Sequence, residues 1–201
     1  IASIVRASMF AQGATGAGFL SLFGGSERGL WADASPSHYV LQKGDFVMFD
    51  GGCTVDGYFA DISRMASIGE PRDADYELYE CAREAHAAGV AACQVGTTMA
   101  ALFAAANDVF DRRGVGHLKV LGFGQLGHGI GLSLHERPDV SYQSENKIEA
   151  GMVVAVEPAI SDQPVWKDSS IFYIVESNIH ITDNGPENLT SLSDKLYIAR
   201  S

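Results

Sequence analysis

The sequence predicts an α+β fold, in which strands and helices occupy separate stretches of the chain. Two β-rich runs joined by a glycine-containing turn predict a hairpin over residues 45–69. Two helical patterns follow, and the first covers residues 75–95. Two further strand-like runs cover residues 152–160 and 169–182. This grouping of strands around a block of helices is typical of an α+β domain.

The chain before the hairpin predicts a helix, a strand and a loop. Four apolar residues recur at helical spacing before Gly13, namely Ile1, Ile4, Val5 and Met9. Residues 18–26 (GFLSLFGGS) predict a short strand that runs into a glycine turn. Residues 35–45 (SPSHYVLQKGD) predict a loop that leads to the hairpin.

The two central helices are predicted from their ends and their apolar faces. The first ends at Gly96, and the second has Thr97 as its N-cap candidate and ends before Gly114. Apolar residues of the second helix fall at i, i+3 and i+4 spacing: Met99, Leu102, Phe103, Ala106, Val109 and Phe110. Both helices are therefore expected to pack on the core.

Composition limits the class of protein. A chain of 201 residues with 46% hydrophobic and 19% charged residues is typical of one globular domain. It has neither an apolar run near 20 residues nor a signal-peptide layout, so we expect a cytoplasmic protein with no membrane partner. A net charge of -11 without a basic cluster argues against nucleic acid as a partner. The three cysteines lack CxxC spacing and are expected to be free thiols.

Four carboxylates interrupt runs that otherwise read as apolar strands. Asp50 lies in FVMFDGG, Asp61 in GYFADIS, Glu157 in MVVAVEPAI and Glu176 in IFYIVESNI. Burying a carboxylate is costly unless a positive charge compensates for it. Asp50 and Asp61 are eleven residues apart across the hairpin turn, so they are expected to face each other at one end of the sheet.

A divalent metal site explains these carboxylates. Hard cations favour oxygen ligands, and one histidine nitrogen added to several carboxylates suits Mn, Co, Zn or Fe. His128, in the glycine-lined segment GHGIGLSLHERP at residues 127–138, is the expected fifth ligand. The glycines Gly127, Gly129 and Gly131 are expected to permit close backbone approach, because the segment lacks the spacing and the lysine of a phosphate-binding loop.

The ordered motifs of the chain resemble the M24 metallopeptidase family, which includes methionine aminopeptidase, prolidase, aminopeptidase P and creatinase. The motifs are DGG followed by Asp after eight residues, GHGIGL followed by HE, then VEPA and VES. The resemblance covers essentially the whole chain. It implies the pita-bread fold, in which curved antiparallel sheets are covered by helices.

The resemblance also assigns the ligands. Asp50, Asp61, His128, Glu157 and Glu176 match the five family positions that hold two divalent ions bridged by a hydroxide, with Mn expected and Co, Zn or Fe as alternatives. Two adjacent ions make a shared water acidic and polarise a carbonyl, so hydrolysis needs no protein nucleophile.

Three residues receive catalytic roles from the resemblance. Glu157 is the candidate for transferring the proton of the water to the leaving nitrogen. His135, the His of the HE pair, is expected to hydrogen-bond the substrate. His38, in the sequence PSHY, resembles an early active-site histidine of the family and is assigned to substrate binding and catalysis as well.

The subfamily is less determined than the metal site. Peptidases of the prolidase type often have His where this chain has Gly124, and Arg where it has Ile174, and the family's EPG is EPA here at Ala159. These changes are expected to touch the substrate pocket and to leave the ligands intact.

Three functions are therefore considered. The first is an Xaa-Pro aminopeptidase or dipeptidase acting on a peptide. The second is an enzyme of the same fold acting on a small amide or a lyase substrate. The third is a non-catalytic scaffold that binds protein or nucleic acid, which the five retained ligands and the acidic charge disfavour.

Organisation beyond the chain is also implied by the resemblance. Residues 1–201 are expected to be a single catalytic domain that lacks an upstream N-terminal domain, because the chain starts at Ile1 and its motifs favour the prolidase branch. A homodimer is implied as well.

Overall fold

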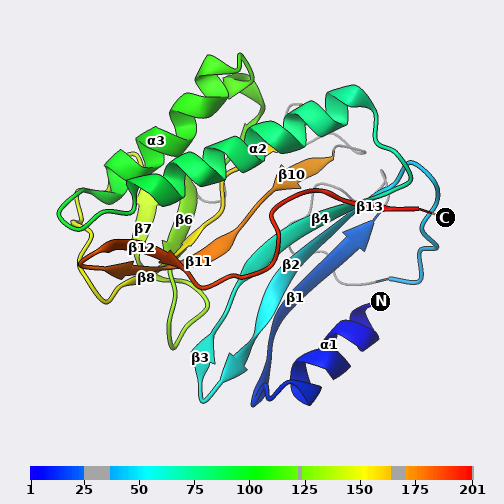
Figure 1. The fold of residues 1–201 in the computed structure, drawn as a ribbon, viewed down its shortest axis with the longest axis horizontal. Coiled ribbons are helices and arrows are strands. Elements are labelled where there is room, and N and C mark those ends of the chain that lie inside the picture. The colour runs from blue at the N-terminus through cyan, green and yellow to red at the C-terminus, as the bar shows by residue number, and fades with distance from the viewer. Residues whose placement is uncertain (25–36, 122–123, 164–170, 201) are drawn as a thin grey trace.

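The structure is a computed structural model that describes residues 1–24, 37–121, 124–163 and 171–200. Residues 25–26 of the predicted first strand, 35–36 of the predicted loop and 169–170 of the predicted last strand lie outside the described residues. Within those ranges the chain forms three sheets and three α-helices (Figure 1).

The predicted hairpin forms the centre of the first sheet. β2 (Phe46–Val55) pairs antiparallel with β4 (Ile62–Ile68), and β3 (Tyr58–Phe59) pairs with the end of β2. β1 (Gly16–Gly24) pairs with the other edge of β2, which confirms a strand in this region. β13 (Tyr197–Ala199) adds to β4 in parallel, so the C-terminal end of the chain closes this sheet.

The other two sheets lie beside the first sheet, on the side of α2 and α3 (Figure 1). The larger has the order β12-β11-β8-β6-β7, and the smaller has the order β10-β9-β5. Their strands are β5 (Lys119–Val120), β6 (Gln125–Gly129), β7 (Glu136–Ser141), β8 (Val153–Val156), β9 (Ala159–Ser161), β10 (Phe172–Ile174), β11 (Ser177–Thr182) and β12 (Gly185–Asn188). A short 3-10 helix, Gly116–Leu118, leads into β5.

The two central helices are present, with one end corrected. α2 (Asp73–Ala92) and α3 (Met99–Arg112) lie within a few residues of their predicted bounds. The N-cap of α3 is Thr98 and not Thr97, because the Thr98 hydroxyl accepts the backbone N–H of Ala101 at 3.1 Å.

The N-terminal helix is present but lies on the surface. α1 (Ala2–Ala11) has no buried residue, and Ile4 is 74% exposed. Its apolar spacing therefore predicted a helix correctly without marking a core element. None of the described helices has the length and apolar character required to cross a membrane.

Two apolar cores lie on the two central helices. α2 packs on β9, β10 and the inner face of the first sheet, where Met48, Met65 and Tyr173 are buried. α3 covers the larger sheet through Leu102 and Ala106. The two helices lie side by side over one side of the molecule, whereas α1 lies at the opposite corner (Figure 1).

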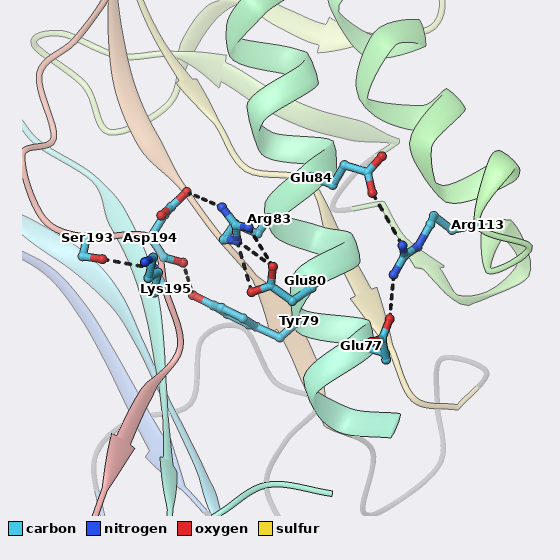
Figure 2. A network of polar contacts seen from close by, with 9 residues as sticks. All are labelled: Glu77, Tyr79, Glu80, Arg83, Glu84, Arg113, Ser193, Asp194 and Lys195. Carbon is cyan, nitrogen blue, oxygen red and sulfur yellow. Dashed lines mark hydrogen bonds and ion pairs between the residues drawn. The ribbon is translucent and has the colours of Figure 1, made fainter. Parts of the chain in front are cut away.

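The segment before β13 is fastened to α2 by polar contacts (Figure 2). The buried Tyr79 donates its hydroxyl to the carbonyl of Asp194 at 2.8 Å. Arg83 lies between Glu80, at 2.7 Å, and the Asp194 carboxylate, at 3.5 Å. These contacts hold the C-terminal segment against the helix that covers the first core.

Candidate metal centre

The five predicted ligands meet where the three sheets join. Their oxygen and nitrogen atoms fall into three overlapping groups, in each of which the ligand atoms lie within 4.8 Å of one another. The groups are Asp50, Asp61 and Glu176; His128, Glu157 and Glu176; and Asp61, His128 and His135. Side chains more than 120 residues apart in the sequence are thus brought to one place.

Glu157 and Glu176 lie where strands change from one sheet to another. Val156 pairs with Ser177 in the larger sheet, and Ala159 pairs with Ile174 in the smaller one. The residues between these pairs belong to neither ladder, so the predicted continuous strands at 152–160 and 169–182 are wrong at these points. At these breaks the side chains do not follow regular strand alternation, and the carboxylates of Glu157 and Glu176 belong to the same ligand group.

Asp50 and Ser63 face each other across the hairpin. They are directly paired between β2 and β4, and the Ser63 hydroxyl donates to Asp50 Oδ1 at 2.9 Å. The same hydroxyl lies 2.9 Å from Glu176 Oε2. Asp61, which was expected to face Asp50, is not its cross-strand partner, because Asp61 lies in the gap between β3 and β4.

His128 is oriented to use one particular ring nitrogen as a ligand. Its Nδ1 lies 3.0 Å from the carbonyl of Gly129, so Nδ1 carries the proton and donates it. The lone pair of Nε2 then faces Glu157, whose Oε1 is 3.6 Å away. Burial lowers the pKa of His128 to about 4, which keeps the ring neutral and able to bind a cation near neutral pH.

Burial and mutual repulsion raise the pKa values of three of the carboxylates. Burial, and then the nearby Asp50, raise the pKa of Asp61 to about 8. The pKa of Glu157 is also raised, by burial first and then by Asp50 and Asp61. Burial, Asp61 and Glu157 raise the pKa of Glu176 well above its ordinary value. Several acids within a few ångströms therefore resist ionising together unless a cation joins them.

Unpaired buried atoms show that these residues fit a divalent metal. Among described residues, four buried side-chain atoms lack a hydrogen-bond partner, and three are Asp61 Oδ1, His128 Nε2 and Glu176 Oε1. The fourth is Nε2 of His86, on α2. Oxygen-rich ligands with one imidazole suit Mn, Co, Zn or Fe, and a cation would supply the partner that each of the three atoms lacks.

Arg64 holds the backbone beside Glu176 and was not predicted from the sequence. Arg64 is 8% exposed, and its guanidinium donates to the carbonyls of Ser63 and Glu176. It also donates to the carbonyls of Leu192 and Ser193 at 3.0 and 2.9 Å. The Arg64 side chain therefore connects β4 to the backbone of Glu176 and to the segment at Leu192 and Ser193.

The two remaining predicted histidines lie in different places. His135 is exposed, and its ring centroid lies 3.9 Å from that of His128. Its position in one ligand group makes it a further metal ligand candidate besides its predicted contact with substrate. His38 is exposed in the loop before β2 and lines a hollow with Arg6 and Tyr39. It belongs to none of the three groups found among the described residues, and its role stays a prediction.

The glycines around His128 permit close backbone packing, as predicted. A Cβ on Gly127 would lie 2.3 Å from the carbonyl oxygen of Ala155 on β8. One on Gly129 would lie 2.9 Å from the carbonyl oxygen of Arg137. Gly131 differs, because its nearest neighbour is the flexible carboxylate of Glu136 at 3.0 Å.

Two of the three departures from the prolidase pattern lie in the core. Ala159 and Ile174 are paired with each other and are each 3% exposed, beneath α2. The expectation that these changes touch the substrate pocket stays a prediction. A side chain at Gly124 would meet no described atom within 4 Å.

Comparison with known proteins decides the family. The sequence model of metallopeptidase family M24 matches residues 1–184. The chain belongs to family M24. This M24 chain is 30% identical to the Xaa-Pro dipeptidase of Pyrococcus furiosus over 196 residues, which are 98% of the chain and 54% of that relative. The M24 chain thus spans about half the length of this curated relative.

Solved structures share the fold of the M24 chain. Dipeptidase PepE from Mycobacterium ulcerans superposes with a TM-score of 0.90 at 29% identity, over 99% of this chain and 52% of that one. The X-Pro aminopeptidase of Thermotoga maritima gives 0.85 at 28% identity, over 98% and 53%. The α+β pita-bread fold implied by the sequence is therefore confirmed.

Proposed function

We propose that this M24 chain is the catalytic part of a hydrolase that uses two divalent metal ions to cleave the peptide bond before proline. The observation that carries the proposal is the convergence of Asp61, His128 and Glu176, each with a buried ligand atom that has no hydrogen-bond partner among the described residues. Relatives with the names Xaa-Pro dipeptidase and X-Pro aminopeptidase support the choice of substrate.

Five side chains would hold the ions. Asp50, Asp61 and Glu176 form one oxygen-rich group, and His128 and Glu157 complete a second group around Glu176. Divalent ions bound there would acidify a water molecule and polarise the scissile carbonyl. Mn²⁺ suits this set of ligands, and Co²⁺, Zn²⁺ and Fe²⁺ are the alternatives to be tested.

The protein side chains would handle the proton and the substrate. Glu157 is 29% exposed at its side chain, unlike the fully buried Glu176, so it can exchange a proton with a substrate. His135, exposed above His128, would donate to the carbonyl side of the substrate.

A matrix of metals and substrates tests this proposal. The chain is freed of metal with a chelator and reloaded with Mn²⁺, Co²⁺, Zn²⁺ or Fe²⁺. It is then assayed on Xaa-Pro dipeptides, on longer peptides with proline second, on peptides without proline and on small amides. We expect hydrolysis before proline that depends on Mn²⁺ or Co²⁺ and falls to background in Asp61→Asn.

Two outcomes would reject the proposal in different ways. No hydrolysis of any substrate with any metal would remove the enzyme assignment. Hydrolysis of small amides without hydrolysis of Xaa-Pro bonds would keep the metal centre and replace the substrate class.

A further inference from the structure

Asp61 lies at a point where the backbone has no strand partner. Residues 60 and 61 separate β3 from β4, so the Asp61 peptide groups are outside the ladder of the first sheet. The Asn178 side chain takes the place of that partner. Its Oδ1 accepts the Asp61 N–H at 3.0 Å, and its Nδ2 donates to the Asp61 carbonyl at 2.8 Å.

This pair of hydrogen bonds reproduces the pattern of a β-ladder. A side-chain amide carries one donor face and one acceptor, as a peptide group does. The Asn178 side chain therefore makes the two hydrogen bonds to Asp61 that a neighbouring strand would otherwise make. Asp61 and Asn178 are 117 positions apart in the sequence. The side-chain amide of Asn178 therefore connects β11 of the larger sheet directly to the hairpin of the first sheet.

Asn178 is itself firmly held. Its side chain belongs to a residue that is 6% exposed, and its backbone pairs with Ala155 on β8. Its N–H donates to Thr190 Oγ1 at 3.1 Å, and its carbonyl accepts the N–H of Leu189 at 2.9 Å. These contacts hold the Asn178 backbone in place, and its side-chain amide in turn holds the Asp61 backbone.

The position of this backbone decides where the carboxylate points. Asp61 is 4% exposed, and its Oδ1 has no hydrogen-bond partner among the described residues. Glu176 directly precedes β11 and shares a ligand group with Asp61. β11 therefore begins next to one proposed ligand and holds the backbone of a second through Asn178.

We propose that Asn178 is a positioning residue that aligns Asp61 for metal binding. The inference rests on the proposed function, because it assumes that Asp61 is a metal ligand. Residues that orient metal ligands typically contribute about 10- to 100-fold to metal affinity. The chain therefore needs an amide at 178 for affinity as well as for packing.

A double-mutant cycle separates positioning from general stability. Mn²⁺ affinity of the whole chain is measured by calorimetry for the wild type, Asn178→Ala, Asp61→Asn and the double variant. We expect Asn178→Ala to weaken Mn²⁺ binding about 10- to 100-fold in the wild type and to have less than about a threefold effect once Asp61 is Asn. The free energy of unfolding without metal should fall equally in both backgrounds, because both keep the Asp61 backbone.

The contrary results are specific. Equal losses of Mn²⁺ affinity in both backgrounds, or no loss in either, would overturn the inference while leaving the proposed function intact. A wild type that binds none of Mn²⁺, Co²⁺, Zn²⁺ and Fe²⁺ would overturn the proposed function and this inference with it.

A second variant covers the case in which Asn178→Ala does not fold. Asn178→Asp keeps the side-chain volume and the acceptor for the Asp61 N–H but replaces the donor with an oxygen. It should bind Mn²⁺ more weakly than the wild type although it adds a negative charge. Binding as tight as that of the wild type, or tighter, would contradict a positioning role.

Discussion

Asp61 has a carboxylate whose ionised form is disfavoured both by burial and by a neighbouring acid. Burial, and then Asp50, raise its pKa to about 8 in the folded chain, from an ordinary value of 3.8. Without metal, the folded state therefore binds more protons than the unfolded state between these two values. The contribution of Asp61 to stability then falls as pH rises from about 4 to about 8.

The variant Asp61→Asn should remove this pH dependence. The free energy of unfolding of metal-free protein is compared between Asp61→Asn and the wild type at pH 5 and at pH 8. The value for the variant minus that for the wild type should be larger at pH 8 by at least about 1.4 kcal/mol, the equivalent of one pKa unit. Urea denaturation at both pH values measures it, with the exposed Asp108→Asn on α3 as the matched control. A difference that is independent of pH would show that Asp61 does not titrate as described.

His135 has two possible uses that one variant distinguishes. Its ring lies 3.9 Å from the His128 ring, and it also belongs to a ligand group with Asp61. If it contacts substrate, His135→Ala should lower kcat/KM about 100-fold, as loss of one transition-state donor does. The Mn²⁺ affinity should then change less than about threefold, in contrast to the 10- to 100-fold expected when a metal-orienting contact is lost.

Calorimetry and steady-state kinetics on the same preparation measure both quantities. A loss of metal affinity that matches the loss of activity would assign His135 to the metal instead.

At the residue scale, the sequence indicated the proposed ligands but not the residues that support them. An acidic residue inside an apolar run is a strong signal, because burial of a carboxylate requires a partner. Ser63, Arg64 and Asn178 give no such signal, since small polar residues and single arginines are common in strands. Their roles arise from contacts across more than 100 positions of the chain, such as Ser63 with Glu176.

At the element scale, the strand breaks could be predicted only in part. Pro158 has no backbone N–H, so it cannot continue the ladder after Glu157. No comparable residue marks the break at Val175 and Glu176, because both have a backbone N–H and valine favours extended backbone. The break becomes apparent only when β10 and β11 are seen to belong to different sheets.

The strand that carries His128 depends on glycine for its place. A methyl group on Gly127 would meet the Ala155 carbonyl oxygen at 2.3 Å, so β6 must move away from β8. We expect Gly127→Ala to lower the free energy of unfolding by about 1–3 kcal/mol, as overpacking does, and to weaken Mn²⁺ binding through His128. Gly131→Ala is the matched control, because its neighbour is a flexible side chain.

Thermal or urea unfolding and Mn²⁺ titration of both glycine variants measure these effects. An unchanged Gly127→Ala would refute the close contact between β6 and β8.

At the scale of the whole molecule, the five proposed ligands lie where the three sheets meet. Asp50 comes from the first sheet, His128 from the larger one, and Glu157 and Glu176 from crossings between the larger and smaller sheets. The fold class could be predicted because the hairpin and the helices have clear periodic patterns. The addition of β13 to the first sheet could not be predicted, because a strand of three residues is too short to show a pattern in the sequence.

Metal binding should therefore stabilise the whole molecule. An ion that joins side chains from different sheets binds the folded chain alone, because the unfolded chain does not bring these residues together. At a free ion concentration of about 100 times Kd, each site should add about 2.7 kcal/mol to the free energy of unfolding.

Titration of Mn²⁺ into the metal-free chain, followed by calorimetry and thermal unfolding, tests the central claim most directly. The account predicts saturable binding of two ions per chain, a higher unfolding temperature, and loss of at least one ion in Asp61→Asn and in Glu176→Gln. Absence of saturable binding, or identical binding by the wild type and both variants, would contradict it.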